Sequence, residues 1–192
     1  MRYIKKYGWV LVLAISLMAG RQSIAQQSYV LSSDQQLKVE GTSTIHDWDM
    51  ISDKATGNAK IELNANKITD INSLAVNLPV ISLKSGKGSM DDNAYEALLA
   101  KQYPQIHFEL TKVENITGQM IKAEGKITIA GTARVILLQV NYKVSEGAIL
   151  FSGGFPITFT QYKIDPPKAM FGTIKTGDEL QISFEATFKL IN

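Results

Sequence analysis

The sequence predicts an all-β domain, folded as an antiparallel barrel with one short helix. Three observations support this prediction. Apolar and polar residues alternate with a period of two along most of the chain, which is typical of strands that bury one face. Turn-forming residues separate the alternating runs at short spacing. A single segment interrupts the alternation with residues that favour a helix.

The first 25 of the 192 residues have the features of a signal peptide. Three basic residues occur among the first six, residues 8–20 form an apolar run, and residues 23–25 offer small side chains for cleavage. We expect cleavage after Ala25, and therefore a periplasmic or secreted protein. A retained membrane anchor is the less favoured alternative, because the apolar run is short for a bilayer span. Residues 26–192 are then one domain, long enough to bury a core.

About eight or nine strands are expected in this domain. The alternating runs are 37–45, 55–63, 74–80, 106–110, 121–129, 135–144, 149–159 and 180–190. The run 135–144 is apolar on both faces for part of its length. Strands with one apolar face must pair faces or close on themselves, and a closed barrel leaves no exposed edge.

Residues from about 90 to 102 are predicted to form the single helix. The segment 91–101 contains no β-branched residue and is rich in helix formers. Ser89 or Asp91 can cap its start, and Pro104 stops it. We expect about three turns, packed across one end or side of the barrel.

The composition excludes several classes of function. The chain has 20 Lys and Arg against 18 Asp and Glu, and four of the basic residues lie in the leader, which leaves 16 against 18. A weakly acidic domain whose one arginine is Arg134 is a poor nucleic-acid binder. Because the chain has no cysteine, it forms no disulfide, thiol nucleophile or cysteine-ligated metal site.

The stretch GTSTIHDW, residues 41–48, holds one of the two histidines beside an aspartate. A metal site needs three or four convergent ligands, and no HxH or HExxH spacing occurs. No GxSxG elbow supplies a nucleophile for a triad with His46. We therefore expect no catalytic or metal-ligating residue and no cofactor. The stretch is interpreted as a strand running into a turn, with Trp48 closing one end of the core.

The apolar face is rich in aromatic rings. Six phenylalanines fall on expected inward positions: Phe108, Phe151, Phe155, Phe159, Phe184 and Phe188. Glycines on the same strands could leave a lumen, and a small barrel is either plugged by side chains or holds one ligand. A ligand of such a lumen must be largely apolar. The segment DPPKAMFG, residues 165–172, is either a rigid loop or a rim that places Met170 and Phe171 over a cavity.

Four blocks of the sequence, in this order and spacing, resemble the YceI-like family. They are VEGTSTIHDWDM from residue 39, GKGSMDDNAYEALLAKQYPQIHFEL from 86, GKITIAGTARVILLQV from 125 and ELQISFEATF from 179. The resemblance covers nearly the whole mature chain. It implies an eight-stranded antiparallel lipocalin-like barrel whose lumen holds a long isoprenoid chain, in a periplasmic or secreted protein.

The resemblance turns the inward positions into candidate ligand-binding residues. Together with the two rim residues they are Val39, Ile45, Trp48, Val80, Phe108, Ile127, Val135, Phe151, Phe159, Met170, Phe171 and Phe184. The expected function is that of a non-enzymatic envelope protein that binds or carries an isoprenoid or similar long-chain lipid. The expected partners are this apolar molecule and, transiently, a membrane or membrane protein, but not nucleic acid. The resemblance also leaves open a homodimer.

Two other functions remain as alternatives. One is a hydrolase or isomerase that uses His46 on a small substrate, which would require the ring to face a cleft in a perturbed environment. The other is a barrel filled by its own side chains, which acts as an interaction module through its outer surface. A lumen with no void larger than a few waters would favour the filled barrel.

Overall fold

The structure is a computed structural model that describes residues 26–191. The predicted signal peptide, residues 1–25, lies outside them. The described part contains eleven strands, one α-helix and three 3₁₀ turns. They are β1 (Gln26–Leu31), β2 (Gln36–Ser43), β3 (Trp48–Ser52), β4 (Thr56–Asn64), β5 (Lys67–Pro79), η1 (Val80–Ser82), α1 (Gly88–Ala97), β6 (Gln105–Thr117), β7 (Met120–Ile129), β8 (Thr132–Ser145), β9 (Ala148–Thr158), η2 (Thr160–Tyr162), β10 (Lys168–Ala169), η3 (Met170–Gly172) and β11 (Ile174–Leu190).

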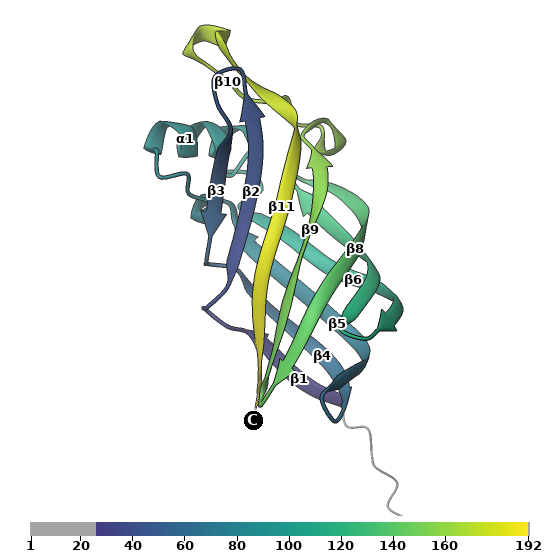
Figure 1. Ribbon diagram of the computed structural model, residues 1–192. Helices are drawn as coiled ribbons and strands as arrows, with labels where there is room; N and C mark the ends of the chain where they lie inside the picture. The colour runs from purple at the N-terminus through teal and green to yellow at the C-terminus, as the bar shows by residue number, and fades with distance from the viewer. Residues whose placement is uncertain (1–25, 192) are drawn as a thin grey trace, which may run out of the picture.

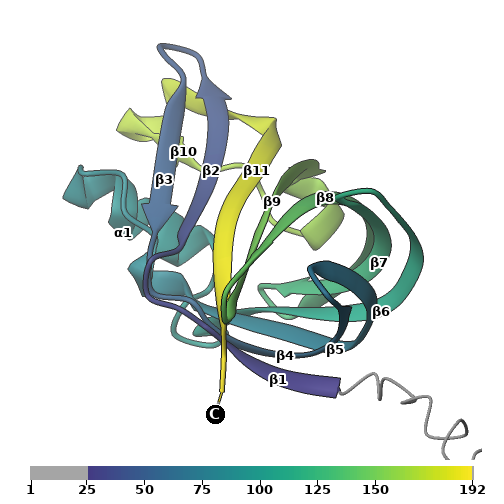
Figure 2. The ribbon, with the colours of Figure 1, turned by 60° about the horizontal axis from the view of Figure 1, so that its bottom comes forward.

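Eight of these strands close into an antiparallel barrel, which confirms the predicted fold class. The hydrogen-bonded order is β1, β4, β5, β6, β7, β8, β9 and β11, and β11 pairs back onto β1. Figures 1 and 2 show this ring from the side and from its lower end. Within residues 26–191, no helix has the length and apolar character needed to cross a membrane.

The longest strand, β11, closes the barrel and divides one of its edges between two partners. One edge pairs with β9 from Glu179 to Lys189. On the other edge, residues 188–190 pair with β1 and residues 176–185 pair with β2. β1 and β2 therefore follow one another along the same edge of β11. The β2–β3 hairpin extends this edge towards the upper end of the molecule, where α1 and β10 also lie (Figure 1).

The alternation of β11 explains why this sequence forms strands. Leu180, Ala186 and Phe188 are buried, while Gln181 and Glu185 between them are exposed. A period of two places each set on its own face of the sheet, so one face packs into the barrel and the other meets solvent. The inward face was predicted correctly here because every second residue is apolar.

The prediction that Val135 faces inward is wrong. Val135 and Leu137 are 65% and 70% exposed, and they pair across β7 with Lys126 and Glu124 on the outer face. The neighbouring residue Leu138 is buried instead. The run is apolar on both faces, so alternation does not identify the inner one, and a shift of one residue exchanges the two faces completely.

The helix α1 begins about two residues earlier and ends about five residues earlier than predicted. Leu99 adopts a left-handed φ of 53°, and this conformation ends the helix before Pro104 is reached. Lys87 stands at the N-cap, and no side chain bonds the first turn. Asp91, the predicted cap, instead accepts hydrogen bonds from the backbone N–H and hydroxyl of Ser85, at 2.8 and 2.7 Å. The helix is thus anchored to the preceding loop.

A buried tyrosine bridges a seam at the lower end of the barrel. β5 and β6 pair only between residues 75–79 and 105–109, so their lower halves are not hydrogen-bonded to each other. The hydroxyl of Tyr142 donates to the carbonyl of Gly118 at 3.0 Å and accepts from the N–H of Ile68 at 3.3 Å. Gly118 belongs to the turn between β6 and β7, and Ile68 belongs to β5. One side chain therefore connects the two strands where the sheet ladder does not.

We predict that Tyr142→Phe lowers the free energy of unfolding by about 1–3 kcal/mol, because both hydrogen bonds are lost in a buried site. Tyr103→Phe is the matched control, since the hydroxyl of Tyr103 makes only an exposed bond to Gln102. It should change stability by less than about 0.5 kcal/mol. Urea unfolding of both variants measures the difference, and equal values would show that Tyr142 does not connect the strands.

Candidate functional site

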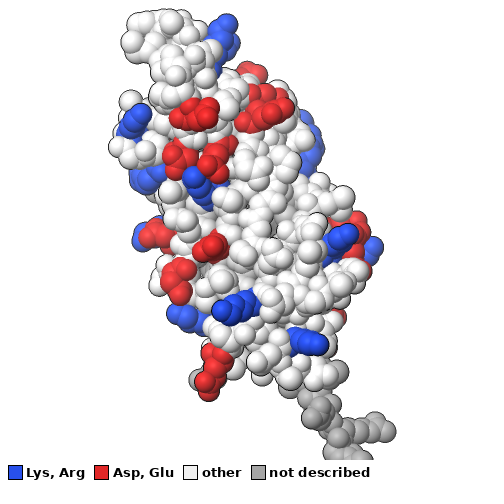
Figure 3. Space-filling view, in the orientation of Figure 1, with Lys and Arg blue, Asp and Glu red and all other residues white. Residues whose placement is uncertain are grey.

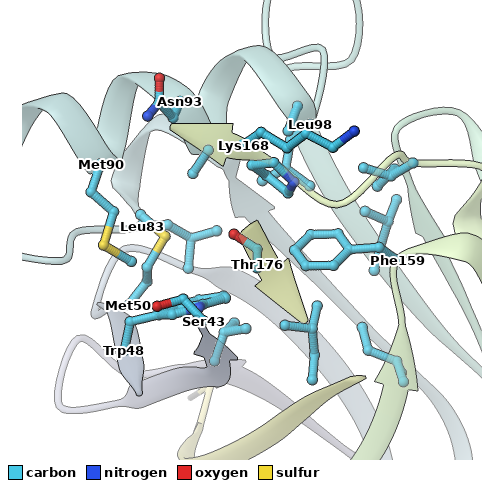
Figure 4. A pocket seen from close by; sticks show the side chains of 18 of the residues that line it. Ser43, Trp48, Met50, Leu83, Met90, Asn93, Leu98, Phe159, Lys168 and Thr176 are labelled. Carbon is cyan, nitrogen blue, oxygen red and sulfur yellow. The ribbon is translucent and has the colours of Figure 1, made fainter. Parts of the chain in front are cut away.

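The upper end of the barrel contains a cavity of about 310 Å³. Its walls come from β2 and β3, from α1, and from the segment that connects β9 to β11. Figure 4 shows Trp48, Met50, Leu83 and Met90 on one side of this space and Phe159 on another. Polar side chains lie among the apolar ones, including Ser43, Asn93 and Thr176. We refer to this space as the upper cavity.

A second cavity of about 180 Å³ lies inside the barrel, and we refer to it as the inner cavity. Apolar strand residues line nearly all of it, and Gln35 and Lys38 are its polar exceptions. The upper and inner cavities share five lining residues, and therefore adjoin. The shared residues are Val39, Leu83, Ile106, Ile129 and Ile182. Each cavity is several times larger than the space that a few water molecules occupy. This is contrary to the alternative of a barrel filled by its own side chains.

Eight of the twelve predicted ligand-binding residues line these two spaces. Val39 lines both cavities. The upper cavity also includes Ile45, Trp48 and Phe159. The inner cavity also includes Phe108, Ile127, Phe151 and Phe184.

The other four predicted residues do not line either cavity. Val135 lies on the outer face, and Val80 is buried in η1, where the strand has already ended and alternation no longer applies. Met170 and Phe171 form the tip of a hairpin and are 69% and fully exposed. They do not cover a cavity as the rim interpretation expected, because the hairpin projects away from the barrel (Figure 1).

Sequence reasoning missed the contribution of the helix and of the β9–β11 connection. Met90, Ala94 and Leu98 line the upper cavity at a spacing of four residues, which is a helical face that could have been recognised. Tyr162 and Ile164 line it from the segment after β9. No periodic pattern marks that segment, since it is a 3₁₀ turn followed by irregular chain.

Two glycines of the barrel wall do not open a lumen, contrary to the prediction. A Cβ at Gly41 would collide with the indole of Trp48, and one at Gly125 would collide with the ring of Phe108. In each case the ring of a neighbouring strand occupies the space above the glycine. The glycines therefore position two of the cavity-lining aromatic rings, and the empty volume lies elsewhere.

The charge at the upper cavity is positive. Lys87 and Lys168 are among its lining residues, and no Asp or Glu is among them. Lys84 is engaged elsewhere, because its ammonium lies 2.7 Å from the hydroxyl of Tyr95 and 3.6 Å from Asp91. An occupant with an apolar chain and an anionic or neutral polar end would match this arrangement.

Two buried polar atoms in the cavity walls have no hydrogen-bond partner among the described residues. They are Oε1 of Gln35, which lines the inner cavity, and the hydroxyl of Tyr162, which lines the upper one. Burial raises the pKa of Tyr162 to about 12, although the guanidinium of Arg134 opposes part of this effect. The phenol therefore stays protonated and can donate a hydrogen bond.

His46 lies at the mouth of the upper cavity and is exposed. Its Nδ1 lies 2.8 Å from the backbone oxygen of Asp47, and Ser43 Oγ donates to the backbone oxygen of His46 at 2.7 Å. These bonds hold the turn between β2 and β3. Within residues 26–191, no carboxylate or nucleophilic side chain is hydrogen-bonded to the His46 ring, and no cluster of three His, Asp or Glu is arranged to hold a metal.

We predict that Tyr162 makes the free energy of unfolding depend on pH in alkaline solution. Its pKa is raised above the usual 10, so its contribution to stability is complete below pH 10 and is lost as the pH rises towards 12. The loss is roughly 1.4 kcal/mol per pH unit across that interval. Tyr162→Phe removes this alkaline loss of stability. The variant should be at least as stable as the parent at neutral pH, because it lacks the unpaired buried hydroxyl.

Guanidinium unfolding of parent and Tyr162→Phe at about pH 9 and about pH 11 measures the difference. Because Tyr29 and the other tyrosines are present in both proteins, their ionisation cancels. A stability difference that does not change between the two pH values would contradict the raised pKa.

Comparison with known proteins identifies relatives of the whole domain. The family model described as YceI-like domain matches residues 27–188. No curated protein matches the chain. Among solved structures, Burkholderia cenocepacia BcnA is 20% identical, with a TM-score of 0.70, and the match covers 82% of this chain and 98% of that one.

Two further structures are similar in fold. A polyisoprenoid binding domain from Saccharophagus degradans, implicated in plant cell wall breakdown, is 11% identical, with a TM-score of 0.66 over 87% of this chain and 100% of that one. A Campylobacter jejuni YceI protein is 22% identical, with a TM-score of 0.58 over 71% and 81%. At these identities the similarity establishes the shared fold.

Proposed function

This chain belongs to the YceI-like family, and we propose that it is a non-enzymatic carrier that holds an isoprenoid or similar long-chain lipid inside its barrel. The observation that supports this proposal best is the pair of adjoining cavities with an apolar lining. The similarity in fold to a polyisoprenoid binding domain is consistent with it. No cofactor is required for binding of this kind.

The proposed mechanism of binding is burial of the chain. Each methylene group transferred from water to an apolar wall contributes about 0.8 kcal/mol, so a chain of many carbons binds without strong polar contacts. The inner cavity would receive the apolar end, because its lining residues are apolar except for Gln35 and Lys38. The polar end would remain at the upper cavity, near Lys87, Lys168 and the hydroxyl of Tyr162.

The N-terminal segment supports a place in the cell envelope. Residues 1–25 have the basic start, apolar run and small residues of a signal peptide, and cleavage after Ala25 would release residues 26–192 into the periplasm or the medium. A lipid with a long apolar chain is insoluble in these aqueous compartments. A carrier that encloses the chain would let it leave one membrane and reach another.

Native mass spectrometry and organic extraction of the purified protein test the proposal directly. We expect a bound long-chain lipid after purification, or saturable binding of an added long-chain prenol. A protein with neither the co-purified lipid nor saturable prenol binding would not be a carrier of this class.

We predict that Ala123→Phe weakens prenol binding by about tenfold or more, because the new ring occupies the inner cavity that Ala123 lines. Ala133→Phe on the exposed face of β8 is the matched control and should leave the affinity unchanged. Overpacking can cost about 1–3 kcal/mol of stability, so circular dichroism must show that both variants are folded. Equal prenol affinity in the two variants would place the ligand outside the inner cavity.

His46→Ala distinguishes the carrier from the enzyme alternative. We predict that prenol affinity changes by less than about twofold and that the free energy of unfolding changes by less than about 0.5 kcal/mol. The reason is that the His46 ring is exposed and bonds only the neighbouring backbone oxygen. Isothermal titration and urea unfolding measure both quantities. Hydrolysis or isomerisation of a small substrate that disappears with this substitution would support the enzyme instead.

A further inference from the structure

A short hairpin projects from the upper end of the molecule. β10 pairs with the start of β11, with Lys168 opposite Lys175 and Ala169 opposite Ile174. The tip consists of residues 170–173, and it is the uppermost part of the described chain in Figure 1. Lys168 and Ile174 at its base also line the upper cavity. The hairpin is therefore continuous with the mouth of the proposed ligand site.

The residues at the tip are not explained by folding. Met170 and Phe171 have φ values of 50° and 57°, in the left-handed region where bulky side chains cost roughly 1–2 kcal/mol each. Turns that need two such residues strongly favour Asn-Gly or Gly-Gly. Met170 is 69% exposed and Phe171 is fully exposed, so burial within the domain does not offset the cost. An unfavourable backbone that displays two large apolar side chains suggests a role outside the monomer.

The charged residues of the hairpin itself are all basic. Between Asp165 and Asp178 the charged residues are Lys168 and Lys175. They stand directly opposite each other in the hairpin, an arrangement that destabilises a strand pair. Neither ammonium lies within ion-pair distance of a carboxylate in the described residues. The two lysines are therefore available to an anionic surface.

The turn between β2 and β3 belongs to the same end of the molecule. The N–H of Thr44 donates to the backbone oxygen of Lys175 at 3.0 Å, which fastens this turn to the base of the hairpin. Its neighbour Ile45 is exposed and also lines the upper cavity. Ile45 thus exposes an apolar side chain beside the opening, and Met170 and Phe171 expose theirs on the hairpin that projects from it.

We propose that this hairpin, residues 168–175, docks the protein end-on to an anionic lipid bilayer. Met170 and Phe171 enter the interface between headgroups and acyl chains, and Lys168 and Lys175 contact the lipid phosphates. The mouth of the upper cavity then faces the membrane that supplies or receives the lipid. In this last respect the inference rests on the proposed function.

The charge distribution of the barrel favours this orientation over a side-on one. Glu40, Asp49 and Glu179 border a hollow on the outer face of β2, β3 and β11. Figure 3 shows acidic side chains gathered there, below the uncharged tip of the hairpin. An anionic membrane would repel this face, so contact through the wall is disfavoured, while contact through the tip keeps the acidic groups farther from the lipid than contact through the wall does.

Vesicle co-sedimentation tests the docking, with protein recovered after export and its N-terminus verified by mass spectrometry. Vesicles of phosphatidylcholine mixed with phosphatidylglycerol are compared with vesicles of phosphatidylcholine alone. We expect binding to the anionic vesicles that weakens with salt. Met170→Ser with Phe171→Ser should reduce the affinity about tenfold or more, as expected for lost burial of two apolar side chains. Lys168→Gln with Lys175→Gln should reduce the affinity by more than about tenfold, because the loss of each lysine reduces it about fivefold.

Matched controls remove similar groups elsewhere on the surface. Val135→Ser with Leu137→Ser deletes the exposed apolar pair of β8, and Lys60→Gln with Lys143→Gln removes two exposed charges from the barrel wall. Both should bind anionic vesicles as the parent does. Equal losses in the hairpin and control variants would overturn the assignment to the hairpin.

Prenol binding in solution separates this proposal from the carrier function. A Met170→Ser, Phe171→Ser variant that retains prenol affinity but no longer extracts prenol from anionic vesicles would support the docking role, because neither residue lines a cavity. A parent protein that binds prenol but not vesicles would overturn the bilayer as partner and indicate a protein acceptor of the tip. A parent that binds vesicles through the hairpin but no prenol would leave the docking intact and refute the carrier.

Discussion

The pairing of β11 is the constraint on which the rest of the structure depends. This strand is long enough to bond β9 along one edge and both β1 and β2 along the other. Pairing with β1 closes the eight-stranded ring and leaves no exposed edge there. Pairing with β2 continues beyond the ring and holds the β2–β3 hairpin above it. One strand therefore builds both a closed barrel and an open extension above it.

The two ends of the barrel differ as a consequence. At the lower end, Tyr142 bridges β5 and the β6–β7 turn where the ladder is interrupted. At the upper end, the walls are assembled from separate pieces, namely the β2–β3 hairpin, α1 and the β9–β11 connection. The larger of the two adjoining cavities lies where these pieces meet. The polar lining residues and the two lysines of the upper cavity, Lys87 and Lys168, lie at this end.

The sequence predicted the strands well wherever their apolar residues alternated strictly, as in β11. It failed for Val135, since a run that is apolar on both faces does not identify the inner one. For residues 165–172 it left a rigid loop and a rim over a cavity open, and the exposure of Met170 and Phe171 is contrary to the rim. Eight of the cavity-lining residues were predicted, but the extents of the two cavities could not be. They depend on where neighbouring strands part and where rings such as Phe108 fold over a glycine, and these are properties of tertiary packing.

An empty apolar cavity is costly, and this cost links occupancy to stability. Atoms that line an unfilled cavity lack van der Waals partners on one side, so the inner cavity of about 180 Å³ lowers the stability of the fold. The hydroxyl of Tyr162 and Oε1 of Gln35, buried without partners, add to the cost. A fold selected only for stability would fill the cavity and remove these groups. Under the proposed function, a bound lipid would fill this space and bring a polar end to these polar atoms, and its binding would then add to the stability of the fold.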